Sequence, residues 1–167
     1  FGLVGSEMCI RDSPIIKNKY QQIFSPQTAY QITSMLKGVI ERGTGKGLKE
    51  LKLELAGKTG TTNKNTDTWF IGFTSNLVVG VYIGYDNPSS LGKFETGSKT
   101  AMPVFKQFIK KTANTFNARP FKVADNINMM VIDAKTGKKA NPKTKLAIIE
   151  SFKNNDNKLD NLSLIHI

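Results

Sequence analysis

The sequence predicts an α+β fold in which an antiparallel sheet is flanked by helices. Two segments have the apolar spacing of amphipathic helices, and between them lie two apolar runs of strand length separated by a short polar turn. The chain has 167 residues, of which 39% are hydrophobic, so it can build about one domain with a buried core.

The first helix is expected over Ser25–Arg42. Ser25 is a favourable N-cap, and Pro26 fits the first helical position, where a missing N–H costs nothing. Gly43 is a common residue just after a helix end. Apolar side chains recur along this segment at helical spacing and predict one buried face: Ala29, Ile32, Leu36, Val39 and Ile40.

Three segments after this helix are interpreted as strands. Leu51–Leu55 alternates leucines with charged residues, which is typical of a half-buried strand, and this pattern runs into Ala56–Gly60. Trp69–Phe73 and Leu77–Tyr85 follow, and Ser75-Asn76 between them is short enough for a hairpin turn. Both runs are apolar at consecutive positions, which predicts a sheet covered on both faces.

Glycines inside these two runs, Gly72, Gly80 and Gly84, predict the close approach of another backbone, most simply that of a packed helix. The second helix is expected over Ala101–Thr112, after a loop at Asp86–Ser98 that is rich in Gly, Ser, Asn and Pro. The order helix, strand, hairpin, helix is what an α+β layer architecture requires.

The pattern of apolar and polar residues divides the whole chain into a main unit, a tail and two ends. Residues 14–115 are interpreted as the main folded unit and residues 116–161 as its C-terminal tail. Met129–Ile132 and Leu146–Ile149 are predicted to form short strands in that tail, around a Thr136-Gly137 turn. Residues 1–13 and 162–167 continue no neighbouring periodicity, so we interpret them as non-native ends and leave them out of the fold.

The composition excludes several kinds of site. Cys9 has no second cysteine with which to form an internal disulfide, and with His166 as the single histidine it cannot build a Cys/His zinc site. A histidine-based nucleophile pair or triad would have to use His166, close to the C-terminus, where chains are usually frayed. No metal and no cofactor are therefore expected.

The chain is basic, with 24 Lys and Arg against 13 Asp and Glu and a net charge of +11. The lysines are spread along the sequence and do not form the long basic block that is typical of nucleic-acid contacts. We interpret the charge as a solvated basic surface and expect no nucleic-acid partner. A basic nucleic-acid-binding module stays open as an alternative function, with binding that would fall steeply with salt.

Gly57-Lys58-Thr59 has the letters that end a phosphate-binding P-loop, but Lys52 occupies the position of the first glycine of that motif. The longer string Lys58-Thr59-Gly60-Thr61-Thr62 suits a different chemistry. A lysine and threonine hydroxyls at a strand end can receive a carboxylate, and Gly60 lets a ligand backbone lie against the strand. The Thr61 N–H can point at a developing oxyanion. Lys135-Thr136-Gly137 repeats the tripeptide in a turn-like stretch and is interpreted as structural.

The order of several longer segments resembles the C-terminal part of the transpeptidase domain of class A penicillin-binding proteins of the 1A type. The resemblance runs from about Pro14 to Phe152. Lys-Thr-Gly is one of the motifs of these serine acyl-transfer enzymes. The segments that carry the likeness are Ala29–Gly45, Ala56–Thr62, Asp67–Phe73 and Gly84–Pro88.

This resemblance implies a partial penicillin-binding, serine β-lactamase-like transpeptidase fold and the site roles that follow. Lys58 and Thr61 would act in catalysis, Lys58 through electrostatics and proton traffic and Thr61 through an oxyanion-hole N–H. The substrate would be bound by Thr59, Gly60, Thr61 and Thr62. The hydroxyls of Thr59 and Thr61 would hold the terminal carboxylate of the donor. Trp69, Phe70 and Tyr85 match family positions that we interpret as core.

The family also needs an upstream Ser-x-x-Lys nucleophile motif and a Ser-x-Asn motif. Ser34-Met35-Leu36-Lys37 has the first pattern but lies inside a helix that matches a non-catalytic family segment, and Ser90-Leu91-Gly92-Lys93 lies downstream. Ser-x-Asn does not occur in the sequence. We therefore interpret the chain as a fragment without its nucleophile, and as inactive alone.

The parent is expected to be a bifunctional peptidoglycan synthase with a glycosyltransferase domain and an N-terminal membrane anchor upstream. It would work at the periplasmic face of a bacterial inner membrane on peptidoglycan stem peptides of lipid II polymer, bind β-lactams, and contact the cell-wall synthesis machinery. A D,D-carboxypeptidase or β-lactamase-type serine hydrolase is an alternative within the same chemistry.

Overall fold

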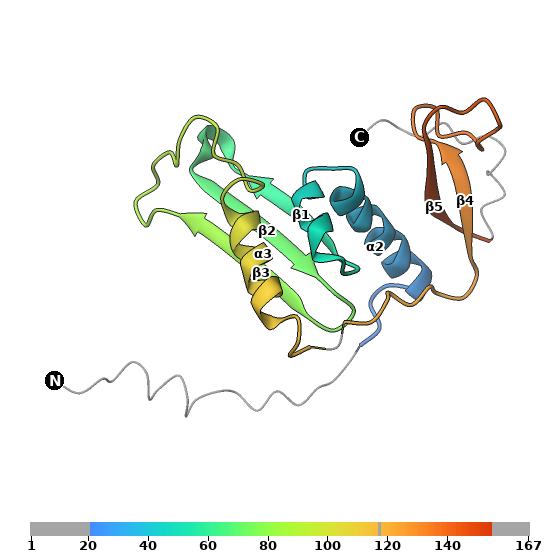
Figure 1. Cartoon of the computed structure of the whole chain (residues 1–167), viewed down its shortest axis with the longest axis horizontal. Coiled ribbons are helices and arrows are strands. Elements are labelled where there is room, and N and C mark those ends of the chain that lie inside the picture. Colours follow the sequence, from blue (N-terminus) through green and yellow to red (C-terminus); the bar gives the residue numbers. More distant parts are fainter. Residues whose placement is uncertain (1–20, 117, 155–167) are drawn as a thin grey trace.

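The computed structural model describes residues 21–116 and 118–154, and the interpretation of residues 1–13 and 162–167 therefore lies outside the described residues. Figure 1 shows a three-stranded sheet with two helices and, beyond α2, a separate two-stranded hairpin. The elements follow in the order α2 (Pro26–Glu41), η1 (Lys46–Leu51), β1 (Ala56–Thr61), η2 (Asn63–Asn65), β2 (Asp67–Phe73), β3 (Val78–Gly84), α3 (Ala101–Thr112), β4 (Ile127–Asp133) and β5 (Ala147–Lys153).

The main sheet is antiparallel, with the strand order β1-β2-β3. The turn between β2 and β3 contains Ser75 and Asn76, as the sequence predicts, and is closed by the Thr74 N–H, which donates to the Leu77 carbonyl at 2.9 Å. Trp69 lies opposite Gly60 on one side and Tyr82 on the other. In this register the centre of β2, Trp69 to Ile71, pairs with the Lys-Thr-Gly motif on β1.

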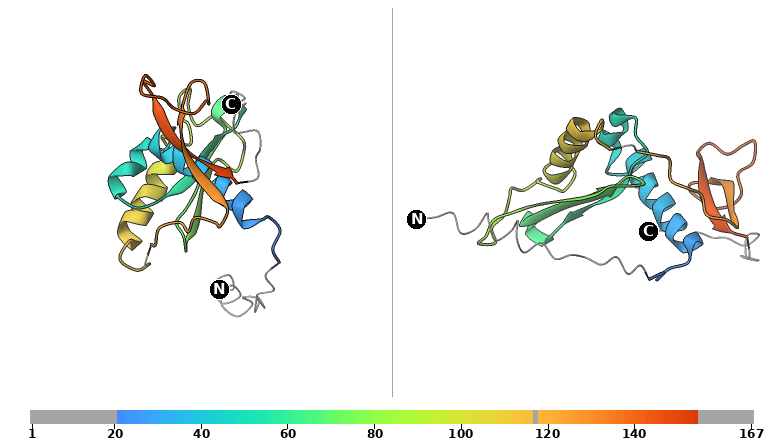
Figure 2. Two further views of the ribbon diagram at one scale, coloured as in Figure 1. Left: turned by 90° about the vertical axis from the view of Figure 1, so that its right-hand side faces the viewer. Right: turned by 90° about the horizontal axis from the view of Figure 1, so that it is seen from below.

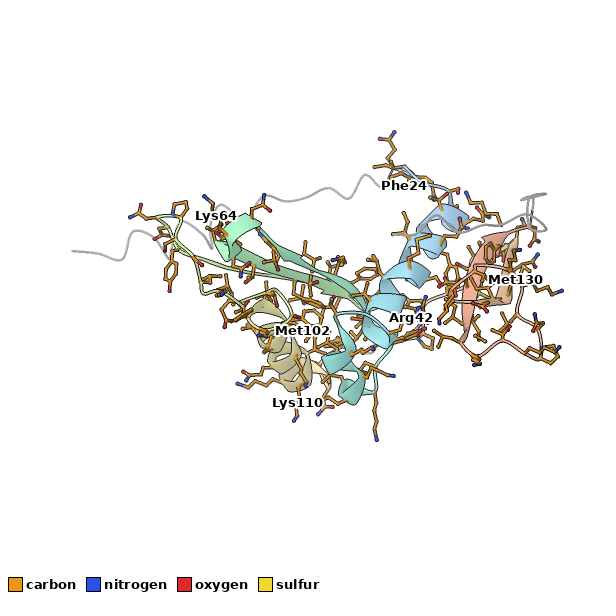
Figure 3. All side chains as sticks on the ribbon, turned by 90° about the horizontal axis from the view of Figure 1, so that it is seen from above. Phe24, Arg42, Lys64, Met102, Lys110 and Met130 are labelled. Atoms are coloured by element: carbon orange, nitrogen blue, oxygen red, sulfur yellow. The ribbon has the colours of Figure 1, made fainter. Side chains whose placement is uncertain are left out.

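The core lies between the sheet and α3, which covers one face of the strands (Figure 2). Phe70 of β2 and Phe105 of α3 are fully buried, with ring centroids 4.8 Å apart. A Cβ placed on Gly72 would lie 2.7 Å from Phe105 Cζ, so α3 does approach this glycine, but through a side chain and not through its backbone. The prediction is wrong for Gly80 and Gly84, whose nearest atoms belong to side chains of β2 and β3. On α3, Met102 faces the sheet and Lys110 points away from it (Figure 3).

The opposite face of the sheet is open in the described part of the chain, which corrects the expectation that both faces are covered. Burial alternates along β2, and the alternate side chains remain about half exposed: 43% for Trp69 and 49% for Ile71. Tyr82 and Tyr85 are 50% and 56% exposed. The interpretation of Trp69 and Tyr85 as core residues is therefore wrong for the described residues, because consecutive apolar letters do not reveal which face is covered.

The predicted strand at Leu51–Leu55 is also wrong. Its start belongs to the short helix η1, and Lys52 follows in a left-handed conformation with φ of 53°, so β1 begins only at Ala56. Leu55 is nevertheless buried, at 3% exposure, and Leu51 and Leu53 pack partly buried against the core. An irregular segment that packs leucines into a core has the same alternating letters as a half-buried strand.

The two predicted helices are confirmed, but the buried face predicted for the first is wrong at Ala29 and Ile32, which are exposed. Ser25 caps α2, because its hydroxyl accepts a hydrogen bond from the Thr28 N–H at 3.3 Å. Gly43 closes the other end with its N–H, which donates to the Gly38 and Val39 carbonyls at 3.1 Å. No helix among residues 21–116 and 118–154 combines the length and apolar character needed to cross a membrane.

The hairpin β4–β5 packs against α2 through polar contacts. Gln31 of α2 donates its side-chain amide to the Ser151 carbonyl at 3.2 Å. Arg42 forms an ion pair with Glu150 and lies between the helix and the hairpin (Figure 3). The two short strands predicted from the sequence are thus confirmed, each with a longer extent.

Candidate active site

The motif Lys58-Thr59-Gly60-Thr61-Thr62 forms the end of β1 and the start of the turn into β2. Within the described chain, β1 is an edge strand that pairs on one side only. The Thr62 N–H donates to the Asp67 carbonyl on the paired side at 3.0 Å. Because the direction of backbone groups alternates along an antiparallel strand, the N–H of Thr61 points to the unpaired side.

Lys58 brings a positive charge to that same unpaired edge. Its side chain is exposed, and its ammonium group donates to the Thr59 carbonyl at 2.7 Å. Thr59 is two residues before Thr61, so its backbone groups point to the same side of the strand. The Thr59 carbonyl therefore also points away from β2. A cation and a backbone N–H donor therefore lie along one open strand edge, an arrangement that suits an anionic, extended ligand.

The hydroxyls of Thr59 and Thr61 lie on the face of the sheet that carries α3, since these residues stand opposite the buried Phe70 and Thr68. Thr59 Oγ1 lies 3.0 Å from Thr44 Oγ1 in the loop after α2. Thr61 Oγ1 accepts a hydrogen bond from the Gly97 N–H at 3.1 Å. Two loops distant in sequence thus hold the motif hydroxyls.

Thr62 takes part in the turn that follows the motif. Its hydroxyl lies 2.8 Å from Thr66 Oγ1 and accepts a hydrogen bond from the Asp67 N–H at 2.8 Å. Tyr82 donates its hydroxyl to Asp67 Oδ1 at 2.7 Å, and this bond, with further bonds from Thr66 and Thr62, lowers the pKa of the Asp67 carboxyl. The same bond raises the pKa of Tyr82. The role of Thr62 in substrate binding stays a prediction.

Sequence reasoning missed Thr44 and Gly97 as partners of the motif. Thr44 lies 15 residues before Thr59, and Gly97 lies 36 residues after Thr61. Each belongs to a polar, glycine-containing loop with no local periodicity. The one available sign was the presence of small residues in these loops, which permit close backbone approach.

Ser34 and Lys37, which carry the letters of a nucleophile motif, lie on α2 and not on β1. Both residues line a pocket of about 360 Å³ between α2 and the β4–β5 hairpin. Lys37 forms an ion pair with Glu54. The geometry supports the interpretation of this Ser-x-x-Lys as unrelated to the motif on β1.

The second Lys-Thr-Gly, at Lys135–Gly137, forms a turn between β4 and β5. The N–H groups of Lys135 and Thr136 donate to Asp133 Oδ1 at 2.8 and 3.2 Å, and the Gly137 N–H donates to the Asp133 carbonyl. Gly137 has a φ of 68°, the left-handed region that favours glycine. This copy is structural, as predicted.

Comparison with known proteins explains the β1 arrangement. The family model described as "Penicillin binding protein transpeptidase domain" matches residues 11–110, well over half of the chain. The chain belongs to the penicillin-binding protein transpeptidase family. The resemblance inferred from the motif segments is therefore confirmed.

Relatives extend the similarity beyond the range of the family model. Penicillin-binding protein 1A of Rickettsia conorii is 43% identical over 152 residues, which are 90% of this chain and 19% of that protein. The protein of the same name from Pseudomonas aeruginosa is 40% identical over 137 residues, 81% of this chain and 17% of that protein. The transpeptidase-family chain thus spans about a fifth of the length of these relatives.

The solved structures include penicillin-binding protein 1A from Haemophilus influenzae. It superposes with a TM-score of 0.71 at 28% identity, and the match covers 85% of this chain and 22% of that one. The α+β fold with an antiparallel sheet flanked by helices is therefore the fold of a penicillin-binding protein, as the sequence predicts.

Proposed function

We propose that this chain is the C-terminal part of the transpeptidase domain of a bifunctional peptidoglycan synthase, which cross-links stem peptides by serine acyl transfer. The observation that carries the proposal is the open edge of β1. There the ammonium group of Lys58 and the backbone N–H of Thr61 lie on the same side of one strand, next to two threonine hydroxyls.

The proposed reaction has two transfers. A serine hydroxyl attacks the carbonyl carbon of the penultimate D-alanine of a donor stem peptide and loses its proton to a neighbouring base. The peptide bond to the terminal D-alanine breaks, and that residue leaves with a protonated amine. The amine of a second stem peptide then attacks the resulting ester, and the serine oxygen regains a proton.

The motif residues have defined tasks in this scheme. The positive charge of Lys58 favours the negatively charged forms of groups near the nucleophile, and it attracts the carboxylate of the donor. The hydroxyls of Thr59 and Thr61 hold that carboxylate, while Gly60 lets the donor backbone lie along β1. The Thr61 N–H supplies one half of the oxyanion hole, and loss of such a donor typically costs about 10²–10³ in rate. β-Lactams present the same acyl and carboxylate groups and would trap the serine as a stable ester.

The nucleophile is proposed to come from a part of the gene product outside this sequence. The chain has no Ser-x-Asn, and its Ser34-x-x-Lys37 lies on the hairpin side of α2. The chain also spans about a fifth of its relatives. The full-length protein would in addition contain a glycosyltransferase domain and a membrane anchor that places the site at the periplasmic face of the inner membrane.

A fluorescent penicillin tests the proposal. The full-length protein should form a covalent, hydroxylamine-sensitive adduct, and Lys58→Ala should reduce the rate of labelling by about a hundredfold or more. Lys110→Ala is the matched control, because this lysine points away from the sheet on the far side of α3 (Figure 3). The present chain alone should not be labelled. A stable adduct on it would refute the missing nucleophile and implicate Ser34.

Cross-linking is separated from simple hydrolysis by the products. With a donor stem peptide and an acceptor amine, the full-length protein should release D-alanine and form a cross-linked dimer. Release of D-alanine without dimer would identify a D,D-carboxypeptidase instead.

A further inference from the structure

Gly97 lies flat against both strands at the Lys-Thr-Gly motif. Its N–H donates to Thr61 Oγ1 at 3.1 Å. A Cβ placed on Gly97 would lie 2.4 Å from the Trp69 carbonyl oxygen and 2.6 Å from the Gly60 carbonyl oxygen. Backbone atoms cannot move aside as a flexible side chain can, so this position requires glycine.

The loop that contains Gly97 is itself held on its C-terminal side. The Gly97 carbonyl accepts a hydrogen bond from the Met102 N–H of α3 at 2.8 Å. Thr100 connects the same loop to the sheet, because its hydroxyl lies 2.6 Å from Thr68 Oγ1 on β2. Since α3 and β2 are part of the buried core, Gly97 has little freedom to follow a displaced Thr61.

The hydrogen bond from Gly97 determines what the Thr61 hydroxyl can do. A hydroxyl has one proton to donate and two lone pairs that accept. The Gly97 N–H occupies one lone pair, which leaves the Thr61 proton available for another acceptor and polarises it as a donor. A carboxylate is the acceptor that gains most from such a polarised donor.

We propose that Gly97 is a positioning residue that aims the Thr61 hydroxyl as a donor at the terminal carboxylate of the acyl donor. This inference rests on the proposed transpeptidase function. This role also explains why the loop between β3 and α3 returns to the motif. The contact fixes Thr61 and leaves its hydroxyl proton and its backbone N–H available to a ligand.

The test measures acylation of the full-length protein by a penicillin and by the neutral methyl ester of the same penicillin. Gly97→Ala should slow acylation by the carboxylate form about 10- to 100-fold, the range expected for one hydrogen bond to a charged group. The ester should be affected much less, so the preference for the carboxylate falls. Gly80→Ala is the control, because a Cβ there would lie 3.9 Å from its nearest neighbour, Ile71 Cγ1.

A double-variant cycle separates positioning from general damage. Thr61→Val should lower the same preference, and adding Gly97→Ala to it should lower the preference no further. Independent losses, or equal losses for acid and ester, would overturn the inference while leaving the proposed function intact. A full-length protein that no penicillin acylates would overturn both.

A second measurement leaves Gly97 unchanged, in case the alanine variant does not fold. Hydrogen exchange of the Gly97 amide is measured in the full-length protein. Thr61→Val removes the acceptor and should increase the exchange rate of this amide at least tenfold, whereas Thr61→Ser keeps the acceptor and should preserve the protection. Equal exchange in the valine and serine variants would contradict the proposed contact.

Discussion

Two glycines in the same sheet are expected to respond in opposite directions to alanine. Gly72 faces the core, where an added Cβ would lie 2.7 Å from both Phe105 Cζ and Phe70 Cε1. Gly80 faces the open side of the sheet, and its added Cβ would find its nearest neighbour at 3.9 Å. Gly72 lies on the central strand β2, between Gly57 and Val79, and Gly80 lies on the adjacent strand β3, opposite Ile71.

The magnitude follows from two terms. Replacing a strand glycine by alanine gains about 0.5–1 kcal/mol through the lower entropy of the unfolded chain. At Gly72 two buried rings must also give way, and such overpacking costs about 1–3 kcal/mol. Gly80→Ala should therefore raise the free energy of unfolding, and Gly72→Ala should lower it by a net amount of about 0.5–2 kcal/mol.

Urea unfolding of the chain, followed by the fluorescence of its single tryptophan, measures both free energies. The entropy gain is common to the two variants, so the difference between them reports the packing cost alone. Equal shifts of the two unfolding midpoints, with unchanged m values, would refute the assignment of Gly72 to the α3 contact.

Three further variants test other contacts. Tyr82→Phe removes the strongest of the bonds that lower the pKa of Asp67, so this pKa should rise in an NMR titration. The stability contributed by the Asp67 bonds should be present above about pH 4 and be lost as pH falls through the lowered folded-state pKa. Ser25→Ala deletes the cap of α2 and should cost about 1 kcal/mol in urea unfolding. Burial raises the pKa of Glu150 despite the ion pair with Arg42. Arg42→Ala should therefore loosen the hairpin more at pH 7 than at pH 4, seen as faster amide exchange in β4 with β2 unchanged.

The helices and the β2–β3 hairpin could be predicted because their signals are local. A cap residue, a glycine stop and a two-residue turn each act on neighbours in the chain. Leu51–Leu55 and Trp69 could not be predicted, since alternation and apolar character do not reveal which tertiary neighbour covers a side chain. Leu55 is buried outside any strand, and Trp69 is half exposed within one.

The candidate site, like the fold, could be predicted only in part from the sequence. The chemistry proposed for Lys58 to Thr62 rests on the residue types and their position at the strand end, which the sequence shows. The supports of the motif could not be predicted, because Thr44 and Gly97 reach it from loops that fold back over the sheet. A hydrogen bond between residues 36 positions apart has no periodic signature in a single sequence.

The open edge of β1 is the feature that unites these observations. An unpaired strand edge invites association with other chains, and proteins usually cover such an edge or place charges on it. Here β2 pairs with one side of the strand and two loops contact its hydroxyls, so the motif is held in place, while no strand of the described chain pairs with its other side. The single charge in the motif, Lys58, lies on that side. A strand edge with a cation is suited to receive an extended peptide that ends in a carboxylate, because backbone hydrogen bonds then align the chain and the charge selects its end.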